Sequence, residues 1–222
     1  MVFRDNAGLY ILMKKAVIFI DGNNLYHNLK QMKIKPSNLD FQKFVNVISK
    51  KFSYEVKEVR YYNSMPTIYD GKDIYFSHLK FIDDLRKLPK FQIFTRKLQV
   101  HSTKELLKDK QDLIEAMDLC NSCKPIVEEN LLGAIGNVKK KEKGVDIMIA
   151  IDVVEHALNN KAEAIILVSG DADFIPALEL AKNNNVEIKS ASLAKGYSRQ
   201  LRESFDFFAI GRNLIFEQCL KL

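Results

Sequence analysis

The chain has 222 residues, with 34 Lys and Arg against 28 Asp and Glu and a formal net charge of +6. Its 47% hydrophobic and 28% charged residues, with few glycines and prolines, exclude a disordered or fibrous protein and suit one domain with a sizeable core. No apolar run approaches the roughly 20 residues of a membrane-spanning helix, and three cysteines are too few for a disulfide framework. We therefore expect a cytoplasmic protein with no membrane partner.

Residues 1–12 are expected to be an extension outside the core. Two lysines follow the apolar stretch at 8–13, whereas a signal peptide places its positive charge before the apolar segment. Met13 and the lysines then run directly into the apolar segment Ala16–Ile20, a natural first strand. The core domain is therefore predicted to span residues 13–222.

Strand-like and helix-like segments alternate from this point, as in a parallel α/β sheet. In chain order, the predicted strands are 16–20, 56–63, 91–100, 164–169, 186–190 and 205–210. The predicted helices are 23–32, 39–52, 74–88, 104–119, 145–158, 174–182, 198–203 and 213–220. Residues 101–138 fit the alternation poorly and predict an insertion.

Aspartates follow two of the predicted strands. Asp21 ends the first strand, and Asp171 and Asp173 follow the strand at 164–169. Asp146 lies in the first turn of an otherwise apolar helix. Ligand sites of open parallel sheets lie beyond the carboxyl ends of the strands, so these four carboxylates are expected to converge if the two strands are neighbours.

Such a cluster is stabilised by a hard divalent cation, because unneutralised carboxylates repel each other in a poorly solvated crevice. A set of oxygen ligands favours Mg²⁺ or Mn²⁺ over Zn²⁺, and such an ion suits phosphoryl transfer. Taken singly, Asp21 and Asp173 could instead be helix N-caps. Their joint placement at two strand ends and a helix start favours the metal site.

Three segments resemble, in order, the motifs of the NYN domain family, and most closely its LabA-like branch within the PIN-like nuclease superfamily. They are Phe19-Ile-Asp-Gly-Asn-Asn24, Lys143-Gly-Val-Asp146 and Val168-Ser-Gly-Asp-Ala-Asp173. The resemblance extends from about residue 14 to residue 210. It implies a three-layer, Rossmann-like α/β fold with a mostly parallel sheet and helices on both faces. It also implies Mg²⁺- or Mn²⁺-dependent cleavage of phosphodiester bonds, usually in RNA.

The resemblance also assigns roles to residues. The acidic metal-binding and catalytic set corresponds to Asp21, Asp146, Asp171 and Asp173, while Asn24 and Ser169 match the family's first-motif asparagine and second-motif hydroxyl. Asp152 matches a further acidic position. It lies about 240° around the helix from Asp146 at roughly 3.6 residues per turn, so we expect it either to support a metal ligand without binding the ion itself or to be structural.

Basic residues near the predicted site are candidate contacts for a phosphate backbone, although runs of charge more often form a solvated face. They are Lys143, which is preceded by Lys139, Lys140 and Lys141, and Lys195, Arg199 and Arg202. Cys120 and Cys123 have half of a zinc-site spacing, with no second pair at a credible distance. Neither a P-loop nor a dinucleotide-binding glycine motif is present.

These observations favour a metal-dependent ribonuclease, with single-stranded DNA as a second candidate substrate and self-association left open. The alternative is a catalytically silent module of the same fold that binds nucleic acid or a regulatory partner. A more distant alternative is a small-molecule phosphatase, but the first strand ends in Asp-Gly-Asn rather than in the Asp-x-Asp pair expected there.

Overall fold

The computed structural model describes residues 2–4, 10–68, 71–97, 103–133 and 144–221. They belong to two compact units. The larger unit combines the chain up to Arg96 with the chain from Gly144 onward, and the smaller unit spans residues 97–143. The insertion expected at 101–138 falls within the smaller unit.

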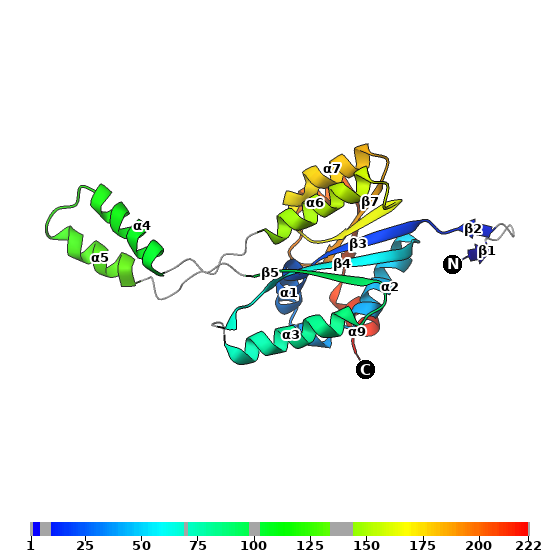
Figure 1. Cartoon of the computed structure of the whole chain (residues 1–222), viewed down its shortest axis with the longest axis horizontal. Helices are drawn as coiled ribbons and strands as arrows, with labels where there is room; N and C mark the ends of the chain where they lie inside the picture. The colour runs from blue at the N-terminus through cyan, green and yellow to red at the C-terminus, as the bar shows by residue number, and fades with distance from the viewer. Residues whose placement is uncertain (1, 5–9, 69–70, 98–102, 134–143, 222) are drawn as a thin grey trace. The chain divides into compact units, whose positions relative to one another are not determined.

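A six-stranded parallel sheet forms the centre of the larger unit (Figure 1). Its strand order is β5-β4-β3-β6-β7-β8. The chain builds one half outward from β3 and then returns to place β6 on the other side of β3, so the strand order reverses between these two strands. The strands are β3 (Lys15–Asp21), β4 (Glu55–Met65), β5 (Phe91–Lys97), β6 (Ala164–Val168), β7 (Glu187–Leu193) and β8 (Asp206–Ile210).

Strand register brings the ends of β3 and β6 to the same edge of the sheet. Ile20 of β3 lies opposite Val168 of β6, and Asp21 lies opposite Tyr62 of β4. The residues that follow β3 and β6 therefore emerge side by side at the point where the strand order reverses. This confirms the sequence-based assumption that the two strands are neighbours.

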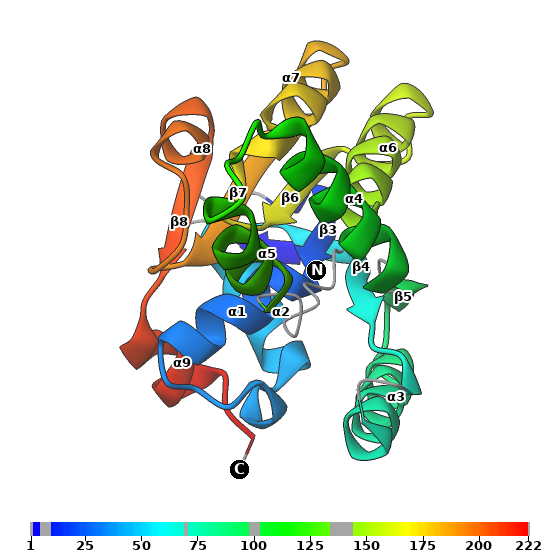
Figure 2. The same ribbon diagram turned by 90° about the vertical axis from the view of Figure 1, so that its left-hand side faces the viewer.

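Helices cover both faces of the sheet (Figure 2). Alternate residues of β3 point to opposite faces. Ile18 and Ile20 pack with α1, α2, α3 and α9, whereas Val17 and Phe19 pack with α6, α7 and α8. The bounds are α1 (Gly22–Gln31), α2 (Phe41–Phe52), α3 (Lys72–Arg86), α6 (Val145–Leu158), α7 (Ile175–Asn183), α8 (Arg199–Ser204) and α9 (Arg212–Gln218). The predicted three-layer α/β fold is therefore confirmed.

Two further parts of the chain lie outside this sheet. Within residues 1–12, β1 (Val2–Arg4) and β2 (Tyr10–Leu12) pair as a separate antiparallel ribbon. The smaller unit contains α4 (Thr103–Ala116), which the sequence predicted, and α5 (Cys123–Gly133), which it did not. None of the helices in the described ranges is long and apolar enough to cross a membrane.

Candidate active site

Asp21 is held rigidly at the carboxyl end of β3. Only 4% of the residue is exposed. One carboxylate oxygen, Oδ1, accepts the backbone N–H of Asn24 at 3.0 Å and so caps α1, while Oδ2 accepts the hydroxyl of Ser169 at 3.0 Å. Burial, together with the negative charge of Asp21, raises the pKa of Tyr61 far above its usual value, so this neighbouring phenol stays protonated.

Ser169 connects Asp21 to Asp171. Its Oγ donates to Asp21 and accepts the backbone N–H of Asp171 at 3.2 Å. Asp171 in turn accepts the backbone N–H of Asp173 at 3.0 Å, which makes it the N-cap of the 3₁₀ helix η4 (Ala172–Phe174). The predicted residues Asp21, Ser169, Asp171 and Asp173 therefore form one continuous hydrogen-bonded chain across the ends of β3 and β6. Asp171 is half-buried and Asp173 is exposed.

Asn24 is a second bridge between the two strand ends. Its side-chain oxygen accepts the N–H of Gly170 at 3.0 Å and the side-chain amide of Asn28 at 2.8 Å. These bonds fix the first turn of α1 against the loop that follows β6. Asn28 is 4% exposed, and sequence analysis did not single it out. Its position four residues after Asn24, on the same face of a predicted helix, was the available signal.

Close backbone packing brings the loop after β7 to the same edge. A Cβ atom on Gly170 would lie only 2.1 Å from the carbonyl oxygen of Gly196, and the Gly170 carbonyl accepts the N–H of Ser198 at 2.8 Å. Gly196 itself has a φ of +83°, a conformation that favours glycine. The segment that carries the predicted basic residues is therefore anchored directly beside Asp171.

The predicted phosphate contacts differ in how they are held. Lys195 is exposed, and Arg199 pairs with Glu203 at 2.6 Å on the surface of α8. Arg202 is exposed and donates to the hydroxyl of Tyr197 at 3.4 Å. Lys143 and the lysines at 139–141 lie outside the described residues.

Asp146 lies on another element, in the first turn of α6, where its side chain is exposed. This helix packs against β3, β4 and α7 through an apolar face that includes Val145, Ile149 and Val153. Within the described ranges, no three His, Cys, Asp or Glu side chains are placed to hold one ion together. Mg²⁺ does not require such a cage, because it commonly takes one or two carboxylates and completes its shell with waters and substrate phosphate. The oxygen donors of Asp21 and Asp171 fit that mode of binding.

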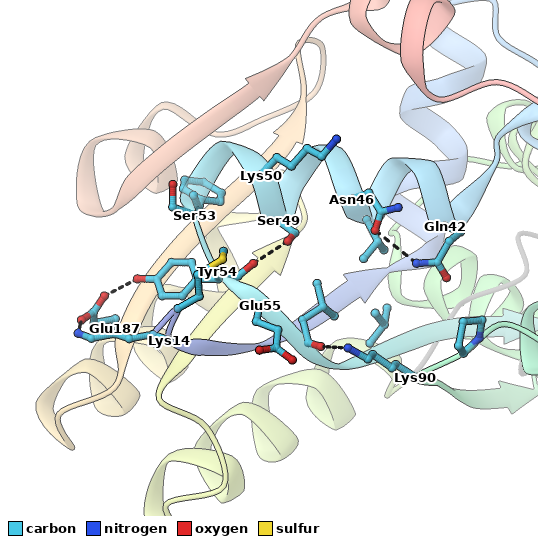
Figure 3. Close-up of a pocket in the computed structure, with 16 residues that line it drawn as sticks. Lys14, Gln42, Asn46, Ser49, Lys50, Ser53, Tyr54, Glu55, Lys90 and Glu187 are labelled. Atoms are coloured by element: carbon cyan, nitrogen blue, oxygen red, sulfur yellow. Dashed lines mark hydrogen bonds and ion pairs between the residues drawn. The ribbon is translucent and has the colours of Figure 1, made fainter. Parts of the chain in front are cut away.

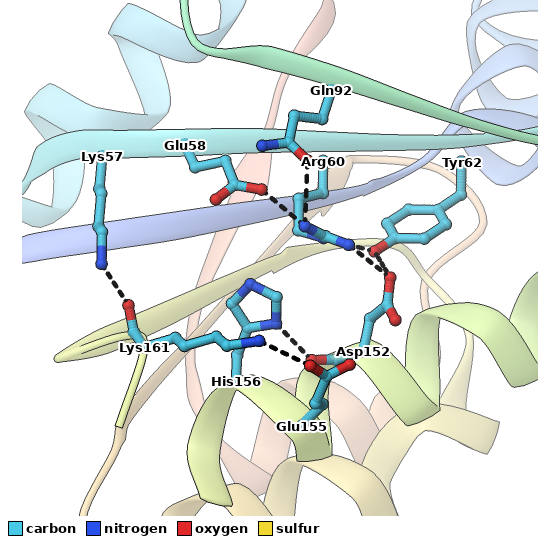
Figure 4. Close-up of polar contacts among 9 residues, drawn as sticks. All are labelled: Lys57, Glu58, Arg60, Tyr62, Gln92, Asp152, Glu155, His156 and Lys161. Carbon is cyan, nitrogen blue, oxygen red and sulfur yellow. Dashed lines mark hydrogen bonds and ion pairs between the residues drawn. The ribbon is translucent and has the colours of Figure 1, made fainter. Parts of the chain in front are cut away.

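Asp152, on α6, points toward β4, where it contacts Arg60 and Tyr62 (Figure 4). Its Oδ2 lies 2.8 Å from Nη2 of Arg60 and 2.5 Å from the hydroxyl of Tyr62. Arg60 also pairs with Glu58 at 2.7 Å and lies over the ring of Phe94. Burial and the hydrogen bond to Asp152 raise the pKa of Tyr62, so it remains a neutral donor. Of the two roles assigned to Asp152, these contacts favour the structural one.

We expect Asp152→Asn to reduce stability by about 1–3 kcal/mol, because it removes one of the two carboxylates that pair with the largely buried Arg60. Asp84→Asn, which breaks a solvent-exposed pair with Lys87, should have a much smaller effect on stability. Chemical unfolding of both variants measures the difference. If the protein is a nuclease, the cleavage rate of the Asp152→Asn variant should stay within about tenfold of the wild-type rate. If Asp152 instead supported a metal ligand, the rate should fall by about 10–100-fold. A large loss of cleavage without loss of stability would contradict the structural role.

A cavity of about 940 Å³ lies at the opposite ends of the strands (Figure 3). Its lining includes Lys14, next to the start of β3, and Glu55, at the start of β4. Asp21 lies at the other end of β3. The cavity is therefore separated from the aspartates by the length of a strand, and we assign it no part in the candidate active site.

A model of the NYN domain matches residues 15–210. The chain belongs to the NYN domain family. This family generally comprises nucleases with a PIN-like fold, and its members usually use divalent metals. The match contains all four aspartates, together with Asn24, and its end coincides with the end of β8.

Comparison with individual proteins adds support for the fold. No curated protein matches the chain. Among solved structures, the chain is similar to a protein of unknown function from Vibrio parahaemolyticus, with 19% identity and a TM-score of 0.54. The similarity covers 94% of this chain and 97% of the other. At this identity, the similarity supports the overall fold alone.

Proposed function

We propose that this NYN protein is a metal-dependent ribonuclease of the LabA-like kind, with its active site at the ends of β3 and β6. The observation that carries the proposal is the hydrogen-bonded chain from Asp21 through Ser169 to Asp171, at the point where the strand order reverses. Ligand sites of open α/β sheets occur at such points. Membership of a family of nucleases supports hydrolysis of phosphodiester bonds there.

Asp21 and Asp171 would hold Mg²⁺ or Mn²⁺, with Asp146 and Asp173 at the margin of the site. A bound ion of this kind lowers the pKa of a coordinated water and neutralises charge that develops on phosphate. Ser169 and Asn24 keep the carboxylates in place, because their hydrogen bonds leave Asp21 and the Gly170–Asp171 backbone little freedom. Asp173, which is exposed, would contact the ion through water or orient the incoming strand.

The cationic segment after β7 would bind the backbone of RNA. Lys195, Arg199 and Arg202 are exposed on a loop and helix anchored to Gly170, next to Asp171. Positive side chains at this position would neutralise phosphates on either side of the cut and offset the repulsion between the aspartates and the nucleic acid. We propose the same role for Lys143, which precedes α6 in the chain. We also propose that single-stranded DNA is a second substrate, bound by the same basic residues.

The alternative function is a silent binding module of the same fold. Its chemistry is less favourable, because a protein that only binds nucleic acid gains nothing from Asp146, Asp171 and Asp173 near the phosphate backbone.

Self-association is a separate proposal. The apolar side chains of Ile147, Ile151 and Leu158 are exposed along one face of α6, and light scattering of the purified protein would measure the oligomeric state. We further propose that the protein works in the cytoplasm, with residues 1–12 as an extension and 101–138 as an insertion.

The experiment that tests the function is cleavage of labelled single-stranded RNA and DNA of mixed sequence with Mg²⁺, Mn²⁺ or EDTA. Metal-dependent cleavage of RNA supports the proposal, and comparison with DNA gives the preferred substrate. Binding of Mn²⁺ without cleavage of either polymer would contradict the ribonuclease assignment and favour another phosphate ester. Absence of both cleavage and metal binding would favour the silent module.

We expect Arg202→Ala to weaken binding of single-stranded RNA and to reduce the salt dependence of that binding. Loss of one phosphate contact should lower the slope of log K against log salt by about 0.7. Fluorescence anisotropy in EDTA measures binding without cleavage. The matched control is Arg86→Ala, because Arg86 is an exposed arginine on α3 that also has an ionic partner, Asp83. Equal slopes for both variants would exclude a phosphate contact at Arg202.

A further inference from the structure

Two cysteines of the smaller unit lie together in the turn that begins α5. The carbonyl of Cys120 accepts the backbone N–H of Cys123 and that of Lys124, both at 3.0 Å. A turn closed by this hydrogen-bonding pattern keeps its first and fourth Cα atoms within about 7 Å. Disulfides span Cα separations of about 4.4–6.8 Å. The backbone therefore already has the separation that a bond between the two sulfur atoms requires.

The side chains in this turn favour reaction at Cys120. Both cysteines are exposed, and Cys120 Sγ lies 3.2 Å from Ser122 Oγ. Hydrogen bonds from the Ser122 side chain, the Cys123 side chain and the backbone of both residues lower the pKa of Cys120 to about 7. A thiol with this pKa is substantially ionised at neutral pH, and the thiolate is the nucleophile in disulfide exchange.

We propose that Cys120 and Cys123 are a redox-active pair that forms a reversible disulfide by exchange with a low-molecular-weight disulfide of the glutathione class. The proposal concerns the smaller unit and is independent of the nuclease function proposed for the larger one. A structural zinc ion at the same place would need about four ligands. Within the described residues, these two thiols have no third His, Cys, Asp or Glu with which to hold an ion.

The exchange takes place in two steps. The thiolate of Cys120 attacks one sulfur of the small disulfide, whose S–S bond breaks, and one small thiolate leaves. The thiol of Cys123 then loses its proton to solvent and attacks the Cys120 sulfur of the mixed disulfide, which expels the second small thiolate. The two small thiolates take up protons from solvent. The protein dithiol has then lost two electrons and two protons, and the small disulfide has been reduced to two thiols.

The third cysteine provides an internal control. Cys219 is fully buried at the end of α9, and burial raises its pKa to about 11. It is therefore expected to remain a thiol under conditions that oxidise the exposed pair. Cys120 and Cys123 are separated from it by nearly a hundred positions in the chain, and Cys219 packs in the core of the larger unit.

The test uses the full chain, reduced, freed of reductant and incubated with oxidised glutathione at pH 7.5. Intact mass and peptide mapping after alkylation of the remaining thiols should show the loss of two hydrogen atoms, a peptide linked through Cys120 and Cys123, and an alkylated Cys219. The Cys123→Ser variant should instead stop at a single glutathione adduct on Cys120, because no second thiol can resolve it. Treatment with dithiothreitol should restore the starting masses.

A second measurement distinguishes the reactive thiol. Alkylation of Cys120 by limiting iodoacetamide should become about tenfold faster between pH 6 and pH 8, as the thiol ionises through a pKa of about 7. A stable glutathione adduct on wild-type Cys120, or two thiols that stay free in oxidised glutathione, would overturn the proposal. Oxidation of Cys219 at the same rate as the pair would overturn it as well.

Discussion

Replacement of Asp171 by asparagine is expected to abolish metal-dependent cleavage while leaving the fold intact. The change removes the negative charge that would bind the cation. It preserves the cap of η4, because asparagine accepts the backbone N–H of Asp173 as well as aspartate does. We expect the rate of cleavage to fall by more than about 100-fold. A loss of about 100-fold is the upper limit for residues that only support a metal ligand, so a direct ligand should cost more. Cleavage of labelled RNA in Mn²⁺ measures the loss.

The matched control for Asp171 is Asp83→Asn. Asp83 is an exposed aspartate on α3 that pairs with Arg86 at 3.0 Å, so the same chemical change is made away from the ends of β3 and β6. Circular dichroism and the unfolding midpoint should be unchanged in both variants, and cleavage should be lost only at Asp171. Retained metal-dependent activity in a folded Asp171→Asn protein would refute the site.

Much of the fold could be predicted because its signals are local. The apolar segment at 16–20 and the apolar helix at 145–158 are recognisable from composition and spacing alone, and both form as expected. Their order along the chain then restricts the topology, because parallel connections between strands are nearly always right-handed. The adjacency of β3 and β6 was a condition of the predicted site rather than a prediction of its own, and the observed register meets that condition.

The parts that could not be predicted depend on contacts that are distant in sequence or on weak local signals. The helix α5 begins at Cys123 and has Pro125 in its first turn, and the sequence predicted no helix there. Prolines are compatible with the first turn, where the backbone N–H groups have no partner within the helix. The ribbon of β1 and β2 was likewise absent from the prediction, since each strand has only three residues.

The candidate site, like the fold, has residues whose place could be predicted from the sequence and residues whose place could not. Asp21, Asp171 and Asp173 could be placed at one edge because each follows a predictable strand. The role of Ser169 as the link between the Asp21 carboxylate and the backbone N–H of Asp171 required the three-dimensional register of β3 and β6. The hydrogen bond from Asn28 to Asn24 has a local signal in the spacing of four residues, but the packing of Asn28 against Gly196, more than 160 residues along the chain, could not be derived from that spacing. That Asp146 binds the same ion as Asp21 and Asp171 remains a prediction, which rests on the motif resemblance.

Replacement of Gly170 by alanine is expected to destabilise the protein by about 3 kcal/mol, at the upper end of the usual cost of overpacking. The new Cβ would lie 2.1 Å from the carbonyl oxygen of Gly196 and 2.9 Å from the Cα atom of Tyr197, both backbone atoms that no rotamer change can move. Gly211→Ala is the matched control, because nothing lies within 4 Å of its Cβ position and its φ of −75° suits alanine. Urea unfolding should place the control within about 0.5 kcal/mol of wild type.

The Gly170 variant also tests whether the loop after β7 belongs to the active site. Relief of the clash must move residues 196–198 away from β6, which breaks the bond from Ser198 N–H to the Gly170 carbonyl. The basic residues on that loop then lose their fixed position beside Asp171, while Asp21 and its cap on α1 keep their own hydrogen bonds. At a temperature where the variant is folded, we therefore expect weaker binding of RNA together with slower cleavage. Unchanged binding and cleavage in a destabilised Gly170→Ala protein would show that the loop supports the fold alone.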